Sequence, residues 1–489
     1  MERRKALKSL GWGVSAGLFM PQLLMSCKKE STVPEVKYSG SVAVIGAGAA
    51  GLYAADILRS KGIKVTVLEA SAILGGRIKS FRSTTQPSSS LFFDPTNPSI
   101  ADFPLELGGD VVYGSNSIWG SIMSDLVVST YDLSGSTNQF ILDNNAQSGA
   151  TWGADADYNA VQNFIAGLPN YSGSGVSVQD ASGVSTRGQA LLNSEAGNFY
   201  GSSSQTIDAG ALGQGLKLHG MEVPKPDGKQ LILKANLMQD VLASRFSQVA
   251  SEVTFNTPIQ SIDYSGSVVV MTTKSGQQIQ ADKVIVTIPI SILKNGGITF
   301  NPGLPAAMAS SMSRIGMDDC VRVLLDFKKN FWGVDTGFIW GGTTVPQYFN
   351  GGVGRSQNYS TLCMNIFGSQ AAELSAMGPD MVTPILSELD AVYAGQASEY
   401  ILRNLNTDAM PALYTIQDWS KEEFIQGGIS YPMVGATNND RVAIGQPINN
   451  MVFFAGEATD VNGDGGTING AMASAERVAT QVVQSITNP

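Results

Sequence analysis

The stretch that most constrains the fold is Val42–Leu58, VAVIGAGAAGLYAADIL. Apolar and β-branched residues run directly into Gly46, Gly48 and Gly51, and an apolar helical pattern follows. This order is typical of a buried parallel strand, a tight turn and a helix that begins at the turn. The first glycine permits the turn, the second leaves room for a pyrophosphate near the backbone, and the third lets the helix pack closely on the strand. The stretch therefore predicts a Rossmann-like dinucleotide-binding unit.

A second strand and an acidic residue complete this unit. The strand is predicted at Lys64–Leu68, and it ends at Glu69. A carboxylate at this place accepts hydrogen bonds from a ribose hydroxyl group and repels a ribose phosphate, so we expect FAD or NAD and not NADP. The free N–H groups at the start of the helix, near Ala49 and Ala50, favour a bound phosphate. Ala70 is expected to contact the ligand beside Glu69.

Size and charge limit the possible functions. A chain of 489 residues, 43% hydrophobic and 15% charged, is long enough for two or three domains with large cores. Acidic residues number 41 and basic residues 31, which gives a net charge of −10. We find no basic stripe beyond the N-terminus, so the composition argues against nucleic-acid binding, which needs clustered basic residues.

The N-terminus has the features of an export signal. A basic start is followed by an apolar stretch that is too short and too rich in glycine for a good membrane span. Leu24 to Cys27 resembles a bacterial lipobox, and Arg3-Arg4 resembles a twin-arginine signal. We therefore expect a signal peptide at 1–27, lipidation of Cys27, a tether at 28–38, and an exported lipoprotein in the periplasm or on the outer membrane. The alternative is a plain secretory signal that happens to contain Cys27.

The remaining cysteines and the single histidine offer little chemistry. Cys320 and Cys363 lie in apolar, strand-like stretches, where buried thiols are the favoured interpretation, although an exported protein could pair them in a disulfide. His219 is the only histidine, and we interpret it as a satisfied surface or core residue and not as a catalyst. No spacing typical of metal ligands is found, so we expect no metal site.

Several further segments resemble the flavin amine oxidase superfamily. Gly75-Gly76-Arg77 resembles the family's second signature, in which an arginine and glycine backbone run along the cofactor. Similar segments are Phe103–Ser117, Val253–Pro305 and Asn449–Ala479. The resemblance implies non-covalently bound FAD. It also implies cofactor contacts, beyond those of the first motif, from Gly76, Arg77, Leu107, Gly108, Gly109, Asp110, Ile259, Pro289, Trp419, Gly456, Glu457, Thr467 and Ile468.

The discontinuous match implies an α/β fold, with an α+β substrate domain inserted into a Rossmann-like FAD-binding domain. The FAD-binding parts are expected at 39–120, 223–300 and 429–489. The substrate domain is expected at 121–222 and 301–428, where few motifs are found. The oligomeric state is left open.

The sequence departs from the family at the predicted pocket. The family usually has a lysine a few residues after a Pro-x-Leu-Pro turn, where it holds a water beside the flavin, and Met308 occupies the aligned position. The family's aromatic cage is replaced by Ile429 and Thr467. Trp419 is retained where an aromatic residue borders the flavin. Tyr113 replaces a histidine or tryptophan, and it either lines the pocket or only packs.

The leading hypothesis is an FAD-dependent oxidoreductase that oxidises a C–N bond of an amine or amino acid by hydride transfer. The electrons would then pass to dioxygen or to a periplasmic carrier, and the missing lysine favours the carrier. One alternative is a desaturase or isomerase of the same fold that acts on a carbon skeleton. Another is an FAD-binding accessory lipoprotein without catalytic activity. We assign no acid–base role to any residue. In this hypothesis the cofactor carries the chemistry, and the pocket residues bind and orient it.

Overall fold

The computed structural model describes residues 36–81, 104–222, 224–355, 360–403 and 412–488. The expectations for the signal peptide, for Cys27 and for most of the tether lie outside these residues. Within the described part of the chain, no helix combines the length and the apolar character that crossing a bilayer requires.

A four-stranded parallel sheet joins three distant parts of the chain. Its order is β2-β1-β11-β20, so β1 pairs with β11, which follows more than two hundred residues later, and β11 pairs with β20. The strands are β1 (Ser41–Ile45), β2 (Lys64–Leu68), β11 (Lys283–Val286) and β20 (Val452–Phe454). The predicted strand at Lys64–Leu68 is confirmed in its bounds. In parallel sheets both faces are covered, which explains why most residues of β1, β11 and β20 are apolar and buried.

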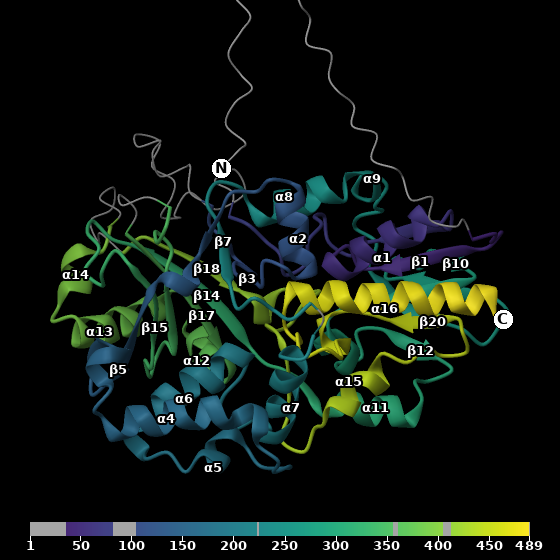
Figure 1. The fold of residues 1–489 in the computed structure, drawn as a ribbon. Helices are drawn as coiled ribbons and strands as arrows, with labels where there is room; N and C mark the ends of the chain where they lie inside the picture. The colour runs from purple at the N-terminus through teal and green to yellow at the C-terminus, as the bar shows by residue number, and fades with distance from the viewer. Residues whose placement is uncertain (1–35, 82–103, 223, 356–359, 404–411, 489) are drawn as a thin grey trace, which may run out of the picture. The chain divides into compact units, whose positions relative to one another are not determined.

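Two layers of apolar residues enclose this sheet. On one face α1 (Ala49–Ser60) packs beside α16 (Ile468–Thr487), and Figure 1 shows these two helices, purple and yellow, running together. The core on that face also includes residues of α2 (Ile118–Asp125), α8 (Met238–Arg245) and α9 (Ser247–Ala250). The opposite face packs on a second sheet and on short helices.

The second sheet lies in the right-hand part of Figure 1, where β10 and β12 are labelled. The second sheet has the order β10-β9-β8-β12, and a three-stranded sheet, β3-β7-β4, and a pair, β13-β19, lie apart from it. Their bounds are β8 (Ile259–Asp263), β9 (Val269–Thr273), β10 (Gln278–Ala281), β12 (Thr299–Asn301), β3 (Val112–Tyr113), β7 (Gln230–Leu233), β4 (Thr130–Asp132), β13 (Ile315–Met317) and β19 (Ser430–Pro432). The helices are α10 (Ile290–Lys294), α11 (Ala306–Ser313) and α15 (Asn438–Ile444).

A seven-stranded sheet forms the core of the remaining part. Its order is β18-β14-β17-β16-β15-β5-β6, and it joins residues from before and after the second sheet. The strands are β18 (Tyr414–Asp418), β14 (Cys320–Asp326), β17 (Thr361–Phe367), β16 (Gln347–Asn350), β15 (Thr336–Trp340), β5 (Thr137–Leu142) and β6 (Asn145–Ser148).

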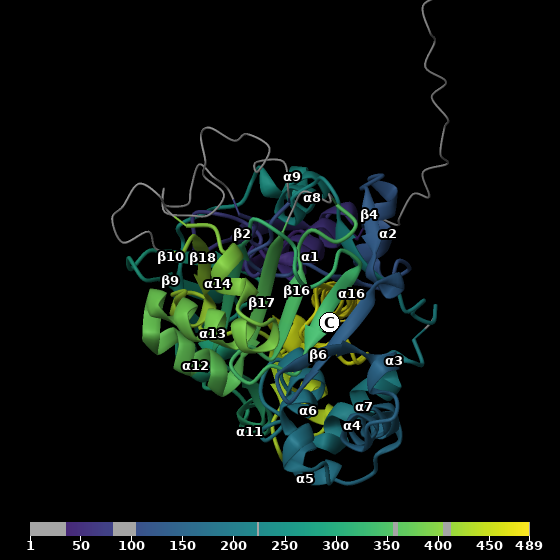
Figure 2. The same cartoon turned by 90° about the vertical axis from the view of Figure 1, so that its left-hand side faces the viewer.

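Helices cover both faces of this large sheet (Figure 2). One face packs on α12 (Gly368–Met377), α13 (Val382–Val392) and α14 (Gln396–Tyr400). The other faces α3 (Gly149–Trp152), α4 (Ala156–Gly167), α5 (Val178–Ser182), α6 (Gln189–Ala196) and α7 (Ala209–His219). The domain boundaries predicted above stay a prediction, since residues 35–489 behave as one compact unit.

The structure decides the question of the disulfide. Cys320 and Cys363 lie on neighbouring strands, but Cys320 pairs with Phe367 and Cys363 with Leu324. Four residues along a strand correspond to about 13 Å, too far for a disulfide bond. Both thiols are free and buried, so the interpretation as buried thiols is confirmed and the disulfide is excluded.

Candidate active site

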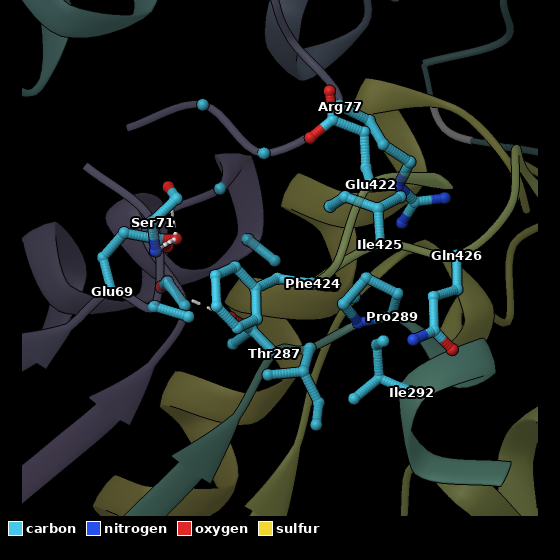
Figure 3. Close-up of a pocket in the computed structure, with 18 of the residues that line it drawn as sticks. Glu69, Ser71, Arg77, Thr287, Pro289, Ile292, Glu422, Phe424, Ile425 and Gln426 are labelled. Atoms are coloured by element: carbon cyan, nitrogen blue, oxygen red, sulfur yellow. Dashed lines mark hydrogen bonds between the residues drawn. The ribbon is translucent and has the colours of Figure 1, made fainter. Parts of the chain in front are cut away.

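Two cavities meet in the interior of the molecule. The first, of about 480 Å³, extends from the glycine turn past Glu69 to Trp419 (Figure 3). The second, of about 330 Å³, is lined by aromatic side chains, including Tyr113, Phe199 and Phe338, and by polar ones. The two cavities share Arg77, Gly109, Trp419, Ile429, Gly466, Thr467 and Ile468.

The glycine turn shows why each glycine is needed. Gly46 has a φ of +110°, a conformation that L side chains rarely adopt. A Cβ at Gly51 would lie 1.9 Å from the carbonyl oxygen of Gly46, so the close approach of α1 to β1 requires glycine. A Cβ at Gly48 would meet no protein atom nearer than 3.9 Å, and it would therefore occupy open space in the first cavity.

This open space fits the pyrophosphate of a dinucleotide. Helix α1 begins there with no side-chain cap and no acidic residue in its first turn, so its N–H groups and its dipole are available to phosphate. The residues lining the first cavity include most of those predicted to bind the cofactor: Gly46, Gly48, Ala49, Ala50, Glu69, Ala70, Gly76, Arg77, Gly109, Ile259, Pro289, Trp419, Gly456, Glu457, Thr467 and Ile468.

Four predicted cofactor residues have other positions. Gly51 lines neither cavity and instead packs against the backbone of Gly46. Gly108 and Asp110 line the second cavity and not the first. Leu107 lines neither cavity, because its side chain is buried in the core. Its carbonyl oxygen instead accepts a hydrogen bond of 2.9 Å from the indole Nε1 of Trp419, which holds the indole at the boundary of the two cavities. Leu107 therefore acts on the site through Trp419.

Glu69 has a second role that sequence reasoning missed. Its Oε2 accepts a hydrogen bond of 2.7 Å from the backbone N–H of Ala47, inside the glycine turn. Its Oε1 accepts one of 2.8 Å from the backbone N–H of Ser71, and Figure 3 shows the two side chains together. Oε1 also accepts the hydroxyl group of Ser71 at 2.8 Å, so Oε2 is the oxygen with a further lone pair for a ribose hydroxyl group. Glu69 thus shapes the turn as well as offering acceptors to the ligand.

An ion pair in the wall of the first cavity joins two segments that are distant in the sequence. Arg77 Nη1 lies 2.8 Å from Oε1 of Glu457 and also donates to the carbonyl oxygen of Gly428 at 2.8 Å. Burial raises the pKa of Glu457, but Arg77, Arg441 and a hydrogen bond from Ser430 outweigh burial, so its pKa lies below the ordinary glutamate value. The carboxylate is therefore charged and holds Arg77 at the boundary of the two cavities.

The position of Met308 corrects the sequence alignment. Met308 is 4% exposed and belongs to the core around Met312, Ile315 and Phe454. It lines neither cavity. The expectation that Met308 stands beside the flavin is therefore wrong, because α11 packs with α15 behind the parallel sheet.

A buried arginine near the second cavity was missed. Arg322, on β14, is 1% exposed, and its Nη2 lies 2.7 Å from Oδ2 of Asp110. Its Nη1 donates to Oδ1 of Asn365 at 2.5 Å, and both partners line the second cavity. Burial works against its charge, but Asp110 raises the pKa of Arg322 overall. A lone arginine in the apolar strand CVRVLLD was the signal that could have found it.

Ile429 and Thr467 lie where the two cavities meet. The hydroxyl oxygen of Thr467 accepts the N–H of Gly470 and thereby caps α16, whose N-terminus faces both cavities. Tyr113 lines the second cavity and stacks edge-on against Phe199, so it both lines the pocket and packs. His219 also lines the second cavity and is not a remote surface residue.

These features define an α/β flavoprotein with a dinucleotide cavity and an adjoining substrate-sized cavity. Residues 219–483 match the family described as flavin containing amine oxidoreductase, and residues 44–116 match an NAD(P)-binding Rossmann-like domain. The chain belongs to the flavin-containing amine oxidoreductase family. The predicted family, the Rossmann-like fold and the FAD cofactor are thereby confirmed, and the protein is an FAD-dependent oxidoreductase.

Relatives cover the chain almost completely. Lysine-specific histone demethylase 2 of Homo sapiens is 24% identical over 95% of this chain, and the chain spans 56% of that protein. Polyamine oxidase 2 of Arabidopsis thaliana is 22% identical over 89% of this chain and 86% of its own length. The chain thus spans little more than half the length of the human and mouse histone demethylases and 30% of a homologue from Arabidopsis thaliana.

Solved structures show the same fold. Cyclohexylamine oxidase from Brevibacterium oxydans superposes with a TM-score of 0.73 at 17% identity, covering 93% of this chain and 100% of that one. Wild-type putrescine oxidase bound to putrescine superposes with a TM-score of 0.71 at 17% identity, covering 91% and 99%.

Proposed function

We propose that this protein oxidises a C–N bond of a small amine or amino acid. FAD, when bound, accepts a hydride from the carbon next to nitrogen. The substrate loses two electrons and becomes an imine, which water hydrolyses to a carbonyl compound and ammonia or an amine. The electrons then pass to dioxygen, which yields hydrogen peroxide, or to a carrier. The family and the names of the similar oxidases support this proposal.

The observation that carries the proposal is the junction of the two cavities. Trp419, Ile429 and Thr467 line both cavities, so a substrate in the second cavity would meet a cofactor in the first beside these residues. The N-terminal end of α16 at Thr467 favours negative charge at this junction, as expected where a ring gains electrons. The chain's residues therefore orient the substrate and stabilise charge.

The second cavity favours a substrate with a polar group over a pure hydrocarbon skeleton. Its aromatic lining is interrupted by Asp110, Gln347 and Asn365. Polar groups placed in an otherwise apolar cavity serve to orient a polar ligand. The desaturase or isomerase alternative stays open for substrates that carry such groups.

The sequence favours a carrier over dioxygen as the electron acceptor, but the structure removes the reason for that preference. The preference rested on Met308 in place of a cation beside the flavin, but Met308 lies in the core and the charged Arg322 lies next to the second cavity. Both dioxygen and a carrier remain open as acceptors in this proposal.

The test is anaerobic mixing of the yellow protein with panels of amines, amino acids and isoprenoids. We expect an amine or an amino acid to bleach the flavin absorbance. If only an isoprenoid bleaches it, the carbon-skeleton alternative replaces the proposal. If no compound bleaches it, although a chemical reductant does, the accessory-protein alternative gains support.

A pair of variants ties the reaction to the second cavity. Leu218 lines this cavity and is 38% exposed, and Leu218→Trp should raise the KM by about tenfold or more without loss of FAD. Val434 is 43% exposed and lines neither cavity, so Val434→Trp is the matched control. Equal KM values in the two variants would show that the substrate does not bind in the second cavity.

We further propose that the protein is exported and anchored through a lipid on Cys27. The support is the N-terminal sequence alone, with its basic start and lipobox-like Leu24 to Cys27. In bacteria that express the full chain with labelled palmitate, the protein should carry the label in the membrane fraction. Cys27→Ala should remove the label, and a labelled Cys27→Ala protein would contradict the proposal.

A further inference from the structure

A loop at the second cavity has the spacing of a cation-binding loop. Asp460-Val461-Asn462-Gly463-Asp464-Gly465 connects a 3-10 helix, Glu457–Thr459, to the start of α16. Oxygen-bearing side chains at positions one, three and five, followed by glycine at position six, are the first half of a calcium-loop pattern. The glutamate that such a loop has at position twelve is replaced by Ala471. Further ligands must therefore come from another segment.

Only one of the two carboxylate oxygens of Asp460 accepts hydrogen bonds from the protein. Its Oδ2 accepts backbone N–H groups from Asn462 at 3.1 Å, Gly463 at 3.0 Å and Asp464 at 2.7 Å. Its Oδ1 is completely buried and has no hydrogen-bond partner, and the whole residue is 2% exposed. A buried carboxylate oxygen without a donor is costly, so an unfilled ligand position is the physical explanation.

The end of α7 brings further ligands to the same place. His219 Nδ1 lies 2.7 Å from Oδ1 of Asp464 and 3.8 Å from Oε2 of Glu222. The ligand atoms of these three residues all lie within 4.8 Å of one another. Asp460 is linked to this cluster through the loop, because its Oδ2 accepts the backbone N–H of Asp464 at 2.7 Å.

The contact between His219 and Asp464 is not an ordinary hydrogen bond. Although the two atoms are 2.7 Å apart, Nδ1 is buried and has no hydrogen-bond partner of acceptable geometry. An imidazole nitrogen and a carboxylate oxygen this close together can both bind one metal ion. The loop and the end of α7 thus each contribute one buried polar atom without a hydrogen-bond partner, Asp460 Oδ1 and His219 Nδ1.

The scaffold holds the two segments in this arrangement. A Cβ at Gly463 would lie 2.1 Å from the carbonyl oxygen of Gly215 and 2.7 Å from the backbone nitrogen of His219. The loop is therefore seated directly on α7. The second oxygen of Asp464 is engaged by the side-chain amide of Asn469, which fixes its orientation.

We propose that Asp460, Asp464, Glu222 and His219 hold a divalent cation beside the second cavity. The neighbouring Arg441 and Arg477 attract Asp460 electrostatically, but they donate their hydrogen bonds to other residues, and Nε of Arg477 is buried without a partner. Arg441 donates to Ser430 and to the Glu457 carbonyl, and Arg477 donates to Gly445, Phe454 and Thr459. A set of carboxylates with one imidazole nitrogen favours Mn²⁺ or Zn²⁺ over Ca²⁺.

The test measures ion binding and not oxidation, so it is independent of the proposed function. The FAD-loaded protein is dialysed against a chelator, then titrated calorimetrically with MnCl₂, ZnCl₂ and CaCl₂. We expect one site per chain for Mn²⁺ or Zn²⁺, with at least tenfold weaker binding of Ca²⁺, and a higher midpoint of thermal unfolding with the ion bound.

Variants locate the site. Glu222→Gln and His219→Gln, both at partly exposed positions, and Asp460→Asn should each weaken binding at least tenfold. Glu373→Gln, on the exposed face of α12, makes the same chemical change away from the cluster and should leave binding unchanged. If Asp460→Asn does not fold, the other two variants still decide the question.

Two results would overturn the proposal. One is the absence of a stoichiometric site for all three ions, which would leave His219 and Asp464 as a simple contact. The other is tight binding that survives both Glu222→Gln and His219→Gln, because the ion would then be held elsewhere.

Discussion

At the scale of single residues, two glycines of one motif have opposite structural surroundings. Gly48 faces open space, and Gly51 touches the backbone of Gly46. The motif alone assigns a role to each glycine. Only the structure shows that a side chain at Gly48 would leave the packing of the protein unchanged but would occupy the space of the ligand.

We therefore predict that Gly48→Val yields a folded, colourless protein. Its side chain would enter the space of the pyrophosphate, and FAD content should fall by at least tenfold. Gly51→Val should instead fail to fold, since its Cβ would lie 1.9 Å from a carbonyl oxygen. Circular dichroism and flavin absorbance separate the outcomes, and a yellow Gly48→Val protein would refute the role given to Gly48.

The second prediction at this scale concerns Met308. Because it is buried in an apolar core, Met308→Lys should lower the free energy of unfolding by several kcal/mol through the cost of a buried charge. It should not change the rate at which dioxygen reoxidises the reduced flavin. Met308→Leu, a volume-conserving change, should cost less than about 1.5 kcal/mol. If Met308→Lys speeds reoxidation of the flavin without loss of stability, Met308 must lie beside the flavin after all.

At the scale of elements, a distant carboxylate serves as the cap of α8. The residue before this helix, Leu237, offers no side-chain cap, and Oε1 of Glu106 accepts the N–H of Met238 at 2.8 Å. Its Oε2 accepts the hydroxyl group of Ser80 at 2.5 Å, so Glu106 joins three segments. Burial raises the pKa of Glu106 to about 7.

This raised pKa predicts a dependence of stability on pH. Between about pH 4.5 and pH 7 the unfolded chain loses the proton of Glu106 while the native protein retains it. The free energy of unfolding therefore falls as the pH rises through this window, by about 3 kcal/mol from this group. Glu106→Gln should flatten the profile relative to the wild type, as measured by thermal unfolding. Glu399 is exposed, so Glu399→Gln should leave the profile unchanged. Parallel profiles for the wild type and both variants would contradict the prediction.

Elements and site differ in how far the sequence could predict them. The strand Lys64–Leu68 and the glycine turn were predictable because local pattern and backbone requirement coincide there. Met308 was misplaced because an alignment over a short turn carries no information on which face of α11 is buried. Arg322 and the capping role of Glu106 depend on partners more than one hundred residues away, Asp110 and Met238, and no local pattern reports such pairs.

At the scale of the whole molecule, the chain passes repeatedly between its two large sheets. The parallel sheet draws strands from residues 41–68, 283–286 and 452–454, and the seven-stranded sheet draws strands from 137–148 and 320–418. This explains why the family resemblance in the sequence is interrupted, and why both cavities are lined by residues from across the described chain.

The pairing of Arg77 with Glu457 has a consequence for the order of events during synthesis. The two residues are 380 positions apart, and β20 and α16 close the same site. A nascent chain on the ribosome therefore has its glycine turn early but cannot enclose a flavin until nearly all of it has been translated. Enclosure of the cofactor is thus a late event, which follows synthesis of the C-terminal strand and helix.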